Sequence, residues 1–412
     1  MTNLFTIVGL CILVPVLVLV ATKVGNNNTL LVNNNKNPSF YVAEVPYAYT
    51  NGVYGEGKTE TDSHYGYASL GPLLAPEHDH WDSIWHRVVA WYINQISMSV
   101  LRTYDIDTAD IIFVPATINE GNKTEQTDFI TNAHFFLPYL GKKPHIVVLS
   151  HAPSWYSEML SHKNSTKFVF ISWGQLNNSD VHVIGAPAFS HVHWSRGSIQ
   201  MQHTGRFFDP NQVKQSKKLL VVGSFVVRNY PDRAAVHKHC LEKTSVCKYV
   251  EYKNAQDAVT VYEAYKSAWY ALHPRGDFLS RNSWFDTWLA ETIPVVFQSE
   301  YINSVPFGDM LNYNKLMIYV PEEKILGENG QNIVSILEEI FDEGEVLQRI
   351  GYIHKVRHVF QYMLNPVHEL IRWDQKAKLH PDDDAFTFTM KSVLRNICSR
   401  GWNSEQCGFN IP

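Results

Sequence analysis

The stretch ALHPRGDFLSRNSWFDTWLAETIPVVFQ, residues 271–298, joins two apolar runs through a polar loop and a helical segment. The first run ends at Pro274 and the second begins at Ile293. Short continuous apolar runs of this kind predict strands that are buried on both faces of a parallel sheet. Because parallel strands are joined by crossover helices, the stretch predicts a βαβ unit and an α/β fold.

The polar loop of this stretch has the composition of an anion site. Ligands of open α/β sheets bind beyond the carboxyl ends of the strands, where Arg275 and Asp277 emerge. Gly276 permits a tight turn, and Arg281 carries a planar guanidinium suited to phosphate oxygens. The N-terminus of the helix predicted at 282–292 would present free N–H groups to the same anion. Surface ion pairs among these arginines and acids are the alternative.

The predicted helix has an apolar face and one acid away from the centre of that face. Its first turn contains Asp286, which we expect to face the crevice and to accept hydrogen bonds from ribose hydroxyls. The alternative is that Asp286 only favours the helix dipole. Ser280, Asn282 or Ser283 can cap the helix. The residues expected on the buried face are Trp284, Phe285, Trp288 and Leu289.

The same alternation of strands and helices extends through most of the chain. Strands are predicted at 39–45, 109–115, 145–151, 167–173 and 182–187, and again at 219–225, 247–252, 268–274, 293–298 and 316–321. Helices are predicted at 82–102, 231–243, 255–267 and 282–292, and the chain becomes mainly helical from 330 onward. A polar segment at 205–218 separates the two sets, so we expect two doubly wound α/β domains.

Length and charge agree with two domains and exclude one class of partner. The 412 residues exceed one typical domain, and the 45% of apolar residues suffice for two cores. The net charge is −5 and no basic stripe occurs, so no nucleic-acid partner is expected.

The N-terminal residues predict a membrane segment. No charge occurs from Leu4 to Ala21, a length near that needed to cross a bilayer. We favour an uncleaved signal anchor over a signal peptide, because no basic region precedes the span and no clean cleavage site follows it. An Asn-rich stem then precedes the folded residues. N-glycosylation sequons occur at Asn27, Asn122, Asn164 and Asn177.

The cysteine spacing permits two disulfide bonds. Cys240 and Cys247 are seven residues apart, and Cys398 and Cys407 are nine apart. Both pairs could form in an oxidising lumen and leave Cys11 over, and buried free thiols are the alternative.

The segment 262–297, YEAYKSAWYALHPRGDFLSRNSWFDTWLAETIPVVF, resembles the signature of the exostosin-like glycosyltransferases, family 47. That pattern consists of a Ser-x-aromatic strand, Pro-x-Gly-Asp, Arg-x-Ser-x-Phe-Asp and Ile-Pro-Val. FYVAEVP and HVIGAPAFSHVHW upstream and DDDAFTFTMKSVLRNI downstream resemble further landmarks in the same order. The resemblance runs from about residue 39 to 397 and is nearest to the plant-type branch that includes xyloglucan galactosyltransferases.

This resemblance implies the GT-B fold, in which two Rossmann-like, doubly wound domains face a cleft, here preceded by an N-terminal transmembrane anchor. The implied segments are an anchor (1–24), a stem (25–38), an acceptor-side domain (39–208), a nucleotide-sugar-binding domain (209–375), and a C-terminal helix and tail packing back on the first domain (376–412). It also implies a single-pass type II protein of the Golgi membrane with a lumenal catalytic part.

The implied activity is an inverting transfer of a sugar from a nucleotide-sugar, a UDP-sugar, to a glycan or polysaccharide. The sugar, the acceptor and a homo- or hetero-oligomeric state stay open. By position, Arg281 would contact the diphosphate, Ser283 the same region and Asp286 the ribose. The complete donor-site prediction is Gly223, Ser224, Arg228, Arg275, Gly276, Asp277, Arg281, Ser283, Asp286 and Glu291.

Glu291 and Thr292 depart from the family pattern, which usually has small residues or Gly-Cys before Ile-Pro-Val. Glu291 lies away from Asp286 on the helical wheel, so the two acids should not share a site. Glu291 could alter donor preference, but charged helix residues are mostly exposed. We therefore expect that it reaches solvent or forms a local ion pair.

An inverting transfer needs a general base for the acceptor hydroxyl and donors for the leaving-group charge. Arg281, with Arg275 and the helix N-terminus, is expected to stabilise the leaving group. His151, which ends a buried strand, is the first candidate for the base and His193 is the second. Further candidates are His191, Glu77, Asp79 and His80.

No essential metal or other cofactor is expected. The Asp-Ile-Asp at 105–107 has the letters of a metal motif, but the resemblance places it where a loop enters a strand. A zinc hydrolase with ligands among His78, His80, His86, His191 and His193 is a distant alternative, because no tight zinc motif occurs. A catalytically inactive, donor-binding relative is the other.

Overall fold

The computed structural model describes residues 37–46, 81–116, 118, 122–150, 153–173, 181–188, 207–227, 230–251, 258–276, 281–301, 305–362, 368–373, 378–402 and 407. Within these ranges no helix combines the length and the apolar character needed to span a membrane. The predicted span Leu4–Ala21, Cys11 and most of the predicted stem lie outside the described residues.

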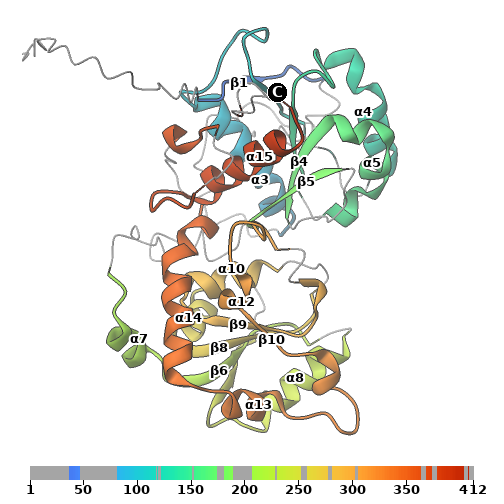
Figure 1. The fold of residues 1–412 in the computed structure, drawn as a ribbon. Coiled ribbons are helices and arrows are strands. Elements are labelled where there is room, and N and C mark those ends of the chain that lie inside the picture. Colours follow the sequence, from blue (N-terminus) through green and yellow to red (C-terminus); the bar gives the residue numbers. More distant parts are fainter. Residues whose placement is uncertain are drawn as a thin grey trace, which may run out of the picture. The chain divides into compact units, whose positions relative to one another are not determined.

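Among the described residues the first sheet has five parallel strands in the order β1-β2-β3-β4-β5. Figure 1 labels β1, β4 and β5 of this sheet. The strands are β1 (Phe40–Val42), β2 (Ile111–Val114), β3 (His145–Val148), β4 (Phe168–Trp173) and β5 (His182–Ala186). The order of these described strands runs in one direction only. Among the described strands the first sheet is therefore not doubly wound, in contrast to the prediction. Winding direction depends on where each crossover returns, which apolar periodicity does not specify.

Helices cover both faces of the first sheet. Alternate residues of β2 point to opposite faces, so Phe113 packs in one cluster with Trp91 of α3 (Trp81–Met98). Val114 packs in the other cluster with Phe129 of α4 (Lys123–Phe136). The short helices η2 (Pro153–Tyr156), α5 (Ser157–Ser161) and η3 (Lys163–Lys167) follow β3.

The second sheet also has five parallel strands, in the order β10-β9-β8-β6-β7. Its strands are β6 (Leu219–Gly223), β7 (Cys247–Tyr249), β8 (Ala268–His273), β9 (Ile293–Val296) and β10 (Ile318–Tyr319). From β6 the chain moves outward to β7 and then back across β6 to β8, β9 and β10. This sheet is doubly wound, as predicted, and its order reverses between β6 and β8.

The predicted elements of the second half occur with shorter bounds. The helices beside and between these strands are α7 (Pro210–Ser216), α8 (Pro231–Leu241), α9 (Ala258–Lys266), α10 (Asn282–Leu289), α12 (Tyr313–Leu316) and η5 (Glu322–Lys324). The later helices are α13 (Ile333–Glu339), α14 (Glu343–Val356), η6 (Arg357–Phe360), η7 (His368–Leu370) and α15 (Ala385–Ser399). All ten strands fall within the ranges that the apolar runs predict.

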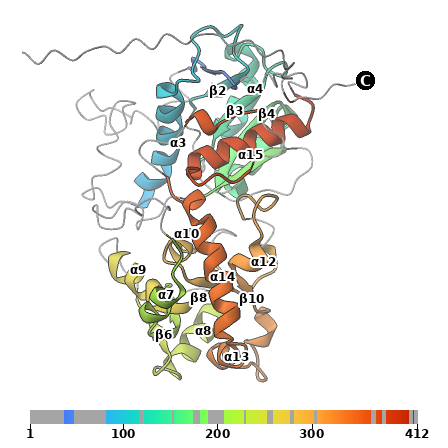
Figure 2. The ribbon, with the colours of Figure 1, turned by 60° about the vertical axis from the view of Figure 1, so that its left-hand side comes forward.

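Helix α15 packs against the first sheet, although it is the last described helix in the sequence. It contacts β5, and Figure 2 shows it beside α3. The ring centroids of Phe386 on α15 and Tyr92 on α3 are 5.3 Å apart. The ring of His182 on β5 donates a hydrogen bond to Asn396 Oδ1 at 2.9 Å. A disulfide joins Cys398 at the end of α15 to Cys407, and another joins Cys240 of α8 to Cys247 of β7.

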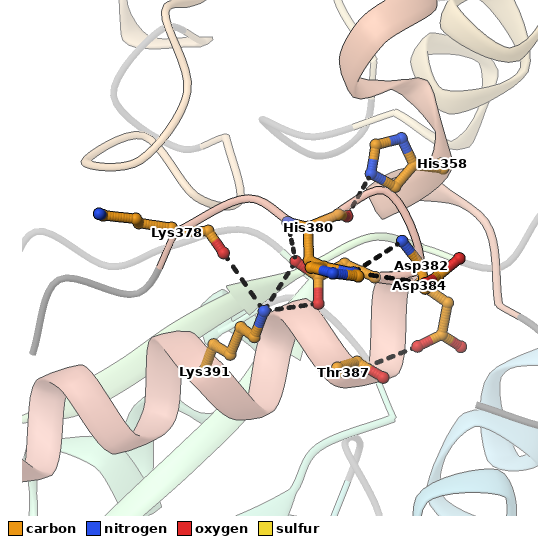
Figure 3. A network of polar contacts seen from close by, with 8 residues as sticks. His358, Lys378, His380, Asp382, Asp384, Thr387 and Lys391 are labelled. Carbon is orange, nitrogen blue, oxygen red and sulfur yellow. Dashed lines mark hydrogen bonds and ion pairs between the residues drawn. The ribbon is translucent and has the colours of Figure 1, made fainter. Parts of the chain in front are cut away.

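A buried ion pair lies at the start of α15 (Figure 3). Lys391 Nζ is 2.6 and 2.9 Å from the two carboxylate oxygens of Asp383, and it also donates to Lys378 O at 3.2 Å. Asp383 is fully buried and Lys391 is 8% exposed. Asp384 caps the helix by accepting from Thr387 N at 2.8 Å.

Candidate functional site

The reversal of strand order between β6 and β8 marks the place where doubly wound sheets bind ligands. Gly223 ends β6, and Ser224 follows it and is 5% exposed. A Cβ atom on Gly223 would lie 3.2 Å from Phe225 Cε1, which is a tight contact. Pro274, Arg275 and Gly276 follow β8, so both predicted groups of donor-site residues lie at this reversal.

Helix α10 begins beside this edge with Arg281 as its N-cap. The backbone of Arg281 is extended at φ −122°, and its guanidinium donates to Pro274 O, which ties the helix start to the end of β8. Burial lowers the pKa of Arg281, and the charge of Arg233 lowers it further. The arginines thus make a positive environment next to the N–H groups of a helix N-terminus, an arrangement suited to an anion.

The first turn of α8 holds the backbone of the loop. Asp232, 1% exposed, accepts from Arg275 N at 2.5 Å and from Arg233 N at 2.9 Å. Arg233 Nε donates to Arg275 O at 2.6 Å. Both backbone groups of Arg275 are therefore fixed, and its exposed side chain lies over the ring of Tyr230 at 5.5 Å.

Neither Asp232 nor Arg233 was among the predicted site residues. Their signal was the Pro-Asp-Arg at 231–233, a helix start that follows a strand of the same sheet. Tyr301 was also missed, and its hydroxyl accepts from Gly276 N at 2.9 Å. Burial raises the pKa of Tyr301 to about 12, so this hydroxyl is protonated at neutral pH.

The imidazole of His273 and the hydroxyls of Ser283 and Thr287 form a hydrogen-bonded group near the start of α10. His273, the last residue of β8, contacts Thr287 Oγ1 through Nε2 at 2.9 Å and Ser283 Oγ through Nδ1 at 3.2 Å. The hydroxyl of Tyr265 is buried and has no hydrogen bond of ordinary geometry to the described residues. Burial and then the charge of Asp286 raise its pKa, while Arg281 and the hydroxyls of Ser224 and Ser283 oppose the rise.

Helix α10 is buried on more faces than predicted. Trp284, Phe285, Trp288 and Leu289 are buried as expected, but Asp286 is also only 8% exposed. The orientation of Asp286 toward the crevice stays a prediction, because a buried carboxylate can still face a ligand site. Asp286 follows Ser283 by three residues on α10, and residues at this spacing are neighbours on one side of a helix.

Glu291 forms a local ion pair at the opposite end of α10 from Arg281. Its carboxylate accepts from His354 Nδ1 and lies 2.9 Å from Arg357 Nη1. Burial would raise the pKa of Glu291, but the His354 hydrogen bond and the charges of Arg357, His354 and Lys217 together lower it. The ion-pair expectation is confirmed, and we leave Glu291 out of the site proposed below.

The backbone conformation at Glu291 is one that glycine adopts without strain. Glu291 has φ +54°, a left-handed conformation that costs most residues about 1 kcal/mol. Thr292 N donates to Thr287 O at 3.1 Å and Glu291 N to Trp288 O at 3.0 Å, which is the Schellman pattern of a helix end. The ion pairs of Glu291 offset the conformational cost.

The polar side chain of Thr292 is fully buried, and its hydroxyl is hydrogen-bonded to neighbouring residues. Its hydroxyl donates to Tyr265 O at 2.5 Å and accepts from Lys217 Nζ at 3.0 Å. Lys217 Nζ also donates to Glu291 O at 2.8 Å. Burial lowers the pKa of Lys217 to about 7.

We expect Glu291→Ala to destabilise the protein more than Glu291→Gly, by about 1 kcal/mol at pH 7. Both variants lose the ion pair, but only glycine adopts the positive φ without strain. Urea unfolding of the three proteins measures this difference. Because the pKa of Glu291 is lowered by folding, the ion-pair contribution is present at neutral pH and is lost as pH falls through the lowered value. An alanine variant as stable as the glycine variant would contradict this account.

Several predicted residues cannot be placed. Arg228, Asp277, Asn27, Asn177 and the base candidates His151, His191, His193, Glu77, Asp79 and His80 lie outside the described residues, as does His78. Asp105 and Asp107 precede β2 in an exposed turn, as expected. Across the described ranges no group of three or more His, Cys, Asp and Glu side chains could hold a metal ion.

The two described sequons differ in environment. Asn122 is exposed and caps α4, accepting from Glu125 N at 3.0 Å. Asn164 is half-buried, and its Nδ2 donates to Ile130 O at 3.2 Å.

Comparison with solved structures gives only distant likenesses. The Anabaena protein HepE in complex with UDP is 9% identical with a TM-score of 0.34, over 71% of this chain and 79% of that chain. An α,α-trehalose-phosphate synthase (UDP-forming) of Burkholderia vietnamiensis is 9% identical with a TM-score of 0.35, over 80% and 76%. At these TM-scores the likeness carries no argument about fold or ligand.

Sequence comparison is more informative. The chain is 26% identical to the probable xyloglucan galactosyltransferase GT15 of Arabidopsis thaliana over 177 residues, which are 40% of this chain and 34% of that protein. It is 24% identical to the xyloglucan galactosyltransferase MUR3 of the same plant over 143 residues, 34% and 20% of the two chains. The matches thus span about a third or less of these relatives.

A family model described as the Exostosin GT47 domain matches residues 34–340. This range includes β1 to β10 and every described residue of the site at α10. Because the model covers well over half of the 412 residues, the chain belongs to the exostosin family 47 of glycosyltransferases.

Proposed function

We propose that the protein transfers a sugar from a UDP-sugar to a glycan or polysaccharide acceptor with inversion at the anomeric carbon. The observation that carries the proposal is the start of α10, where Arg281, the helix N–H groups and buried hydroxyls meet at the strand-order reversal. We further propose the GT-B arrangement, with 39–208 as the acceptor-side domain and 209–375 as the donor domain.

The proposed chemistry places the diphosphate at the N-terminus of α10. As the bond between the anomeric carbon and the diphosphate breaks, negative charge grows on the leaving oxygen, and fixed donors stabilise it. Arg281 and the helix N–H groups supply this stabilisation, and the exposed Arg275 adds a charge at the rim. Asp286 lies on the same side of the helix and is the proposed partner of the ribose.

The acceptor hydroxyl attacks the opposite face of the sugar and loses its proton to a base. We keep His151 as the first candidate for this base and His193 as the second. We also propose that no metal is required, since Arg281 and the N–H groups at the start of α10 can stabilise the negative charge of the leaving group. A Golgi location with an N-terminal anchor remains part of the proposal.

A panel of nucleotide-sugars tests this function. We expect the purified protein to release UDP from one UDP-sugar, UDP-galactose being the first to try, and to retain this turnover after treatment with a chelator. Binding of UDP without turnover of any donor would point to the inactive relative instead. Loss of both bound metal and activity on chelation would contradict the metal-independent mechanism.

A further inference from the structure

The hydrogen bonds around His273 fix the direction of every proton in the group formed by His273, Thr287 and Ser283. Thr287 Oγ1 lies 2.7 Å from Ser283 O, and because a carbonyl oxygen can only accept, the single hydroxyl proton of Thr287 is donated there. Thr287 Oγ1 then has no proton left for His273. At 2.9 Å from Thr287 Oγ1, His273 Nε2 must be the donor of that hydrogen bond.

The state of the imidazole determines the orientation of Ser283. His273 is fully buried, and burial together with the charge of Arg281 lowers its pKa well below the usual value. The ring is therefore neutral, and with Nε2 protonated its Nδ1 is an acceptor. Ser283 Oγ lies 3.2 Å from Nδ1 and donates its only proton to it.

Ser283 consequently keeps only lone pairs for other partners. A phosphate oxygen is an acceptor as well, so it cannot form a hydrogen bond with Ser283 in this state. The hydroxyl of Tyr265, buried next to Ser283, could use no more than one of the two lone pairs. A ligand that satisfies Ser283 must bring a hydrogen-bond donor.

We propose that His273 is a positioning residue whose Nδ1 accepts the only hydroxyl proton of Ser283. Ser283 then accepts a hydrogen bond from a hydroxyl group of the bound nucleotide-sugar, and it forms none with the diphosphate. This inference rests on the proposed function and refines the role of Ser283 within the same site. The partner hydroxyl belongs either to the ribose or to the transferred sugar. In both cases the diphosphate is left to Arg281 and the helix N–H groups.

The binding test compares wild type and Ser283→Ala by calorimetry with UDP, 2′-deoxy-UDP, 3′-deoxy-UDP and UDP-galactose. If the partner is a ribose hydroxyl, Ser283→Ala weakens UDP by about 3- to 10-fold and leaves the affinity for one of the two deoxy analogues unchanged. If the partner is on the sugar, only UDP-galactose is weakened. An equal loss for all four ligands, or no loss for any, would overturn the proposal.

Thr287 supplies the matched pair of variants. Thr287→Val removes the acceptor of the Nε2 proton, so His273 can adopt the other tautomer and release the Ser283 proton toward the ligand. We expect this variant to lose the binding contribution of the partner hydroxyl, and Thr287→Ser to keep it. That contribution is the difference in affinity between UDP and the deoxy analogue for a ribose partner, and between UDP-galactose and UDP for a sugar partner. Equal behaviour of the valine and serine variants would contradict the positioning role.

A measurement without nucleotide separates this inference from the proposed function. In protein with ¹⁵N-labelled histidine, the side-chain signal absent from His273→Gln should show Nε2 protonated and Nδ1 unprotonated, with no titration between about pH 5 and 8. An Nδ1-protonated ring, or titration in this range, would refute the proton arrangement. If the tautomer is as stated but UDP does not bind, the proposed function fails and the role of Ser283 toward a nucleotide fails with it.

Discussion

Arg281→Ala is expected to weaken UDP binding by roughly 30-fold or more and to abolish detectable sugar transfer. Removing a desolvated charged partner from a charge-assisted contact costs about 2–5 kcal/mol. The guanidinium lies at the start of α10 and is tied to Pro274 O, so it is oriented before the ligand arrives. Calorimetric titration with UDP measures the loss.

Two further arginine variants control this result. Arg281→Lys keeps the charge but loses the planar fork, so its affinity should lie between those of wild type and alanine. Arg395→Ala removes a half-exposed arginine whose ion pair with Asp309 spans 3.3 Å, and it should leave UDP affinity unchanged. An Arg281→Ala protein that folds normally and binds UDP like wild type would remove Arg281 from the site.

Lys391→Met is expected to destabilise the protein by about 3–5 kcal/mol, the largest effect on stability that the structure predicts. Lys391 is the cation paired with the fully buried carboxylate of Asp383, and both carboxylate oxygens contact its ammonium (Figure 3). Loss of the lysine leaves an uncompensated charge between α15 and the segment before it. Urea unfolding followed by circular dichroism measures the shift.

The control for this variant is a lysine in an exposed pair. Lys243 lies 3.1 Å from Glu338, and both side chains are about 40% exposed, so Lys243→Met should change stability by less than about 1 kcal/mol. Adding Asp383→Asn to Lys391→Met should recover part of the loss, because the buried charge is then gone. Equal effects of Lys391→Met and Lys243→Met would show that the buried pair contributes no more than a surface one.

Much of the fold follows from local pattern. The apolar runs locate all ten strands, and the spacing of Trp284, Phe285, Trp288 and Leu289 identifies the buried side of α10. The order of the strands within each sheet does not follow from local pattern, because the same apolar runs are compatible with a singly wound or a doubly wound sheet. That is why doubly wound sheets were predicted for both halves and found among the described strands only for the second.

The site is predictable where the residues are contiguous and not where they come from elsewhere in the chain. Gly276 and Arg281 lie in one stretch, and the composition of that stretch predicts an anion-binding role. Asp232 and Tyr301 contact the same loop from distant segments. The Pro-Asp-Arg at 231–233 marks a helix start, but the contact of Asp232 with this loop depends on the tertiary fold.

The environment of Glu291 is also not predictable from local sequence. Its partners His354 and Arg357 lie more than sixty residues away in sequence, and its positive φ is a property of the helix end that the letters do not display. The wheel argument that separated Glu291 from Asp286 assumed a helix through residue 292, whereas α10 ends at Leu289. The ion pair and the backbone conformation together account for an acid where the family usually has a small residue.

The most direct test of the central claim is a side-by-side transfer assay of wild type, Arg281→Ala and Arg395→Ala with UDP-sugars and a polysaccharide acceptor. The account predicts release of UDP and formation of a glycosylated acceptor by wild type and Arg395→Ala, and neither product with Arg281→Ala. Equal turnover by wild type and Arg281→Ala would contradict the claim that the start of α10 holds the donor diphosphate.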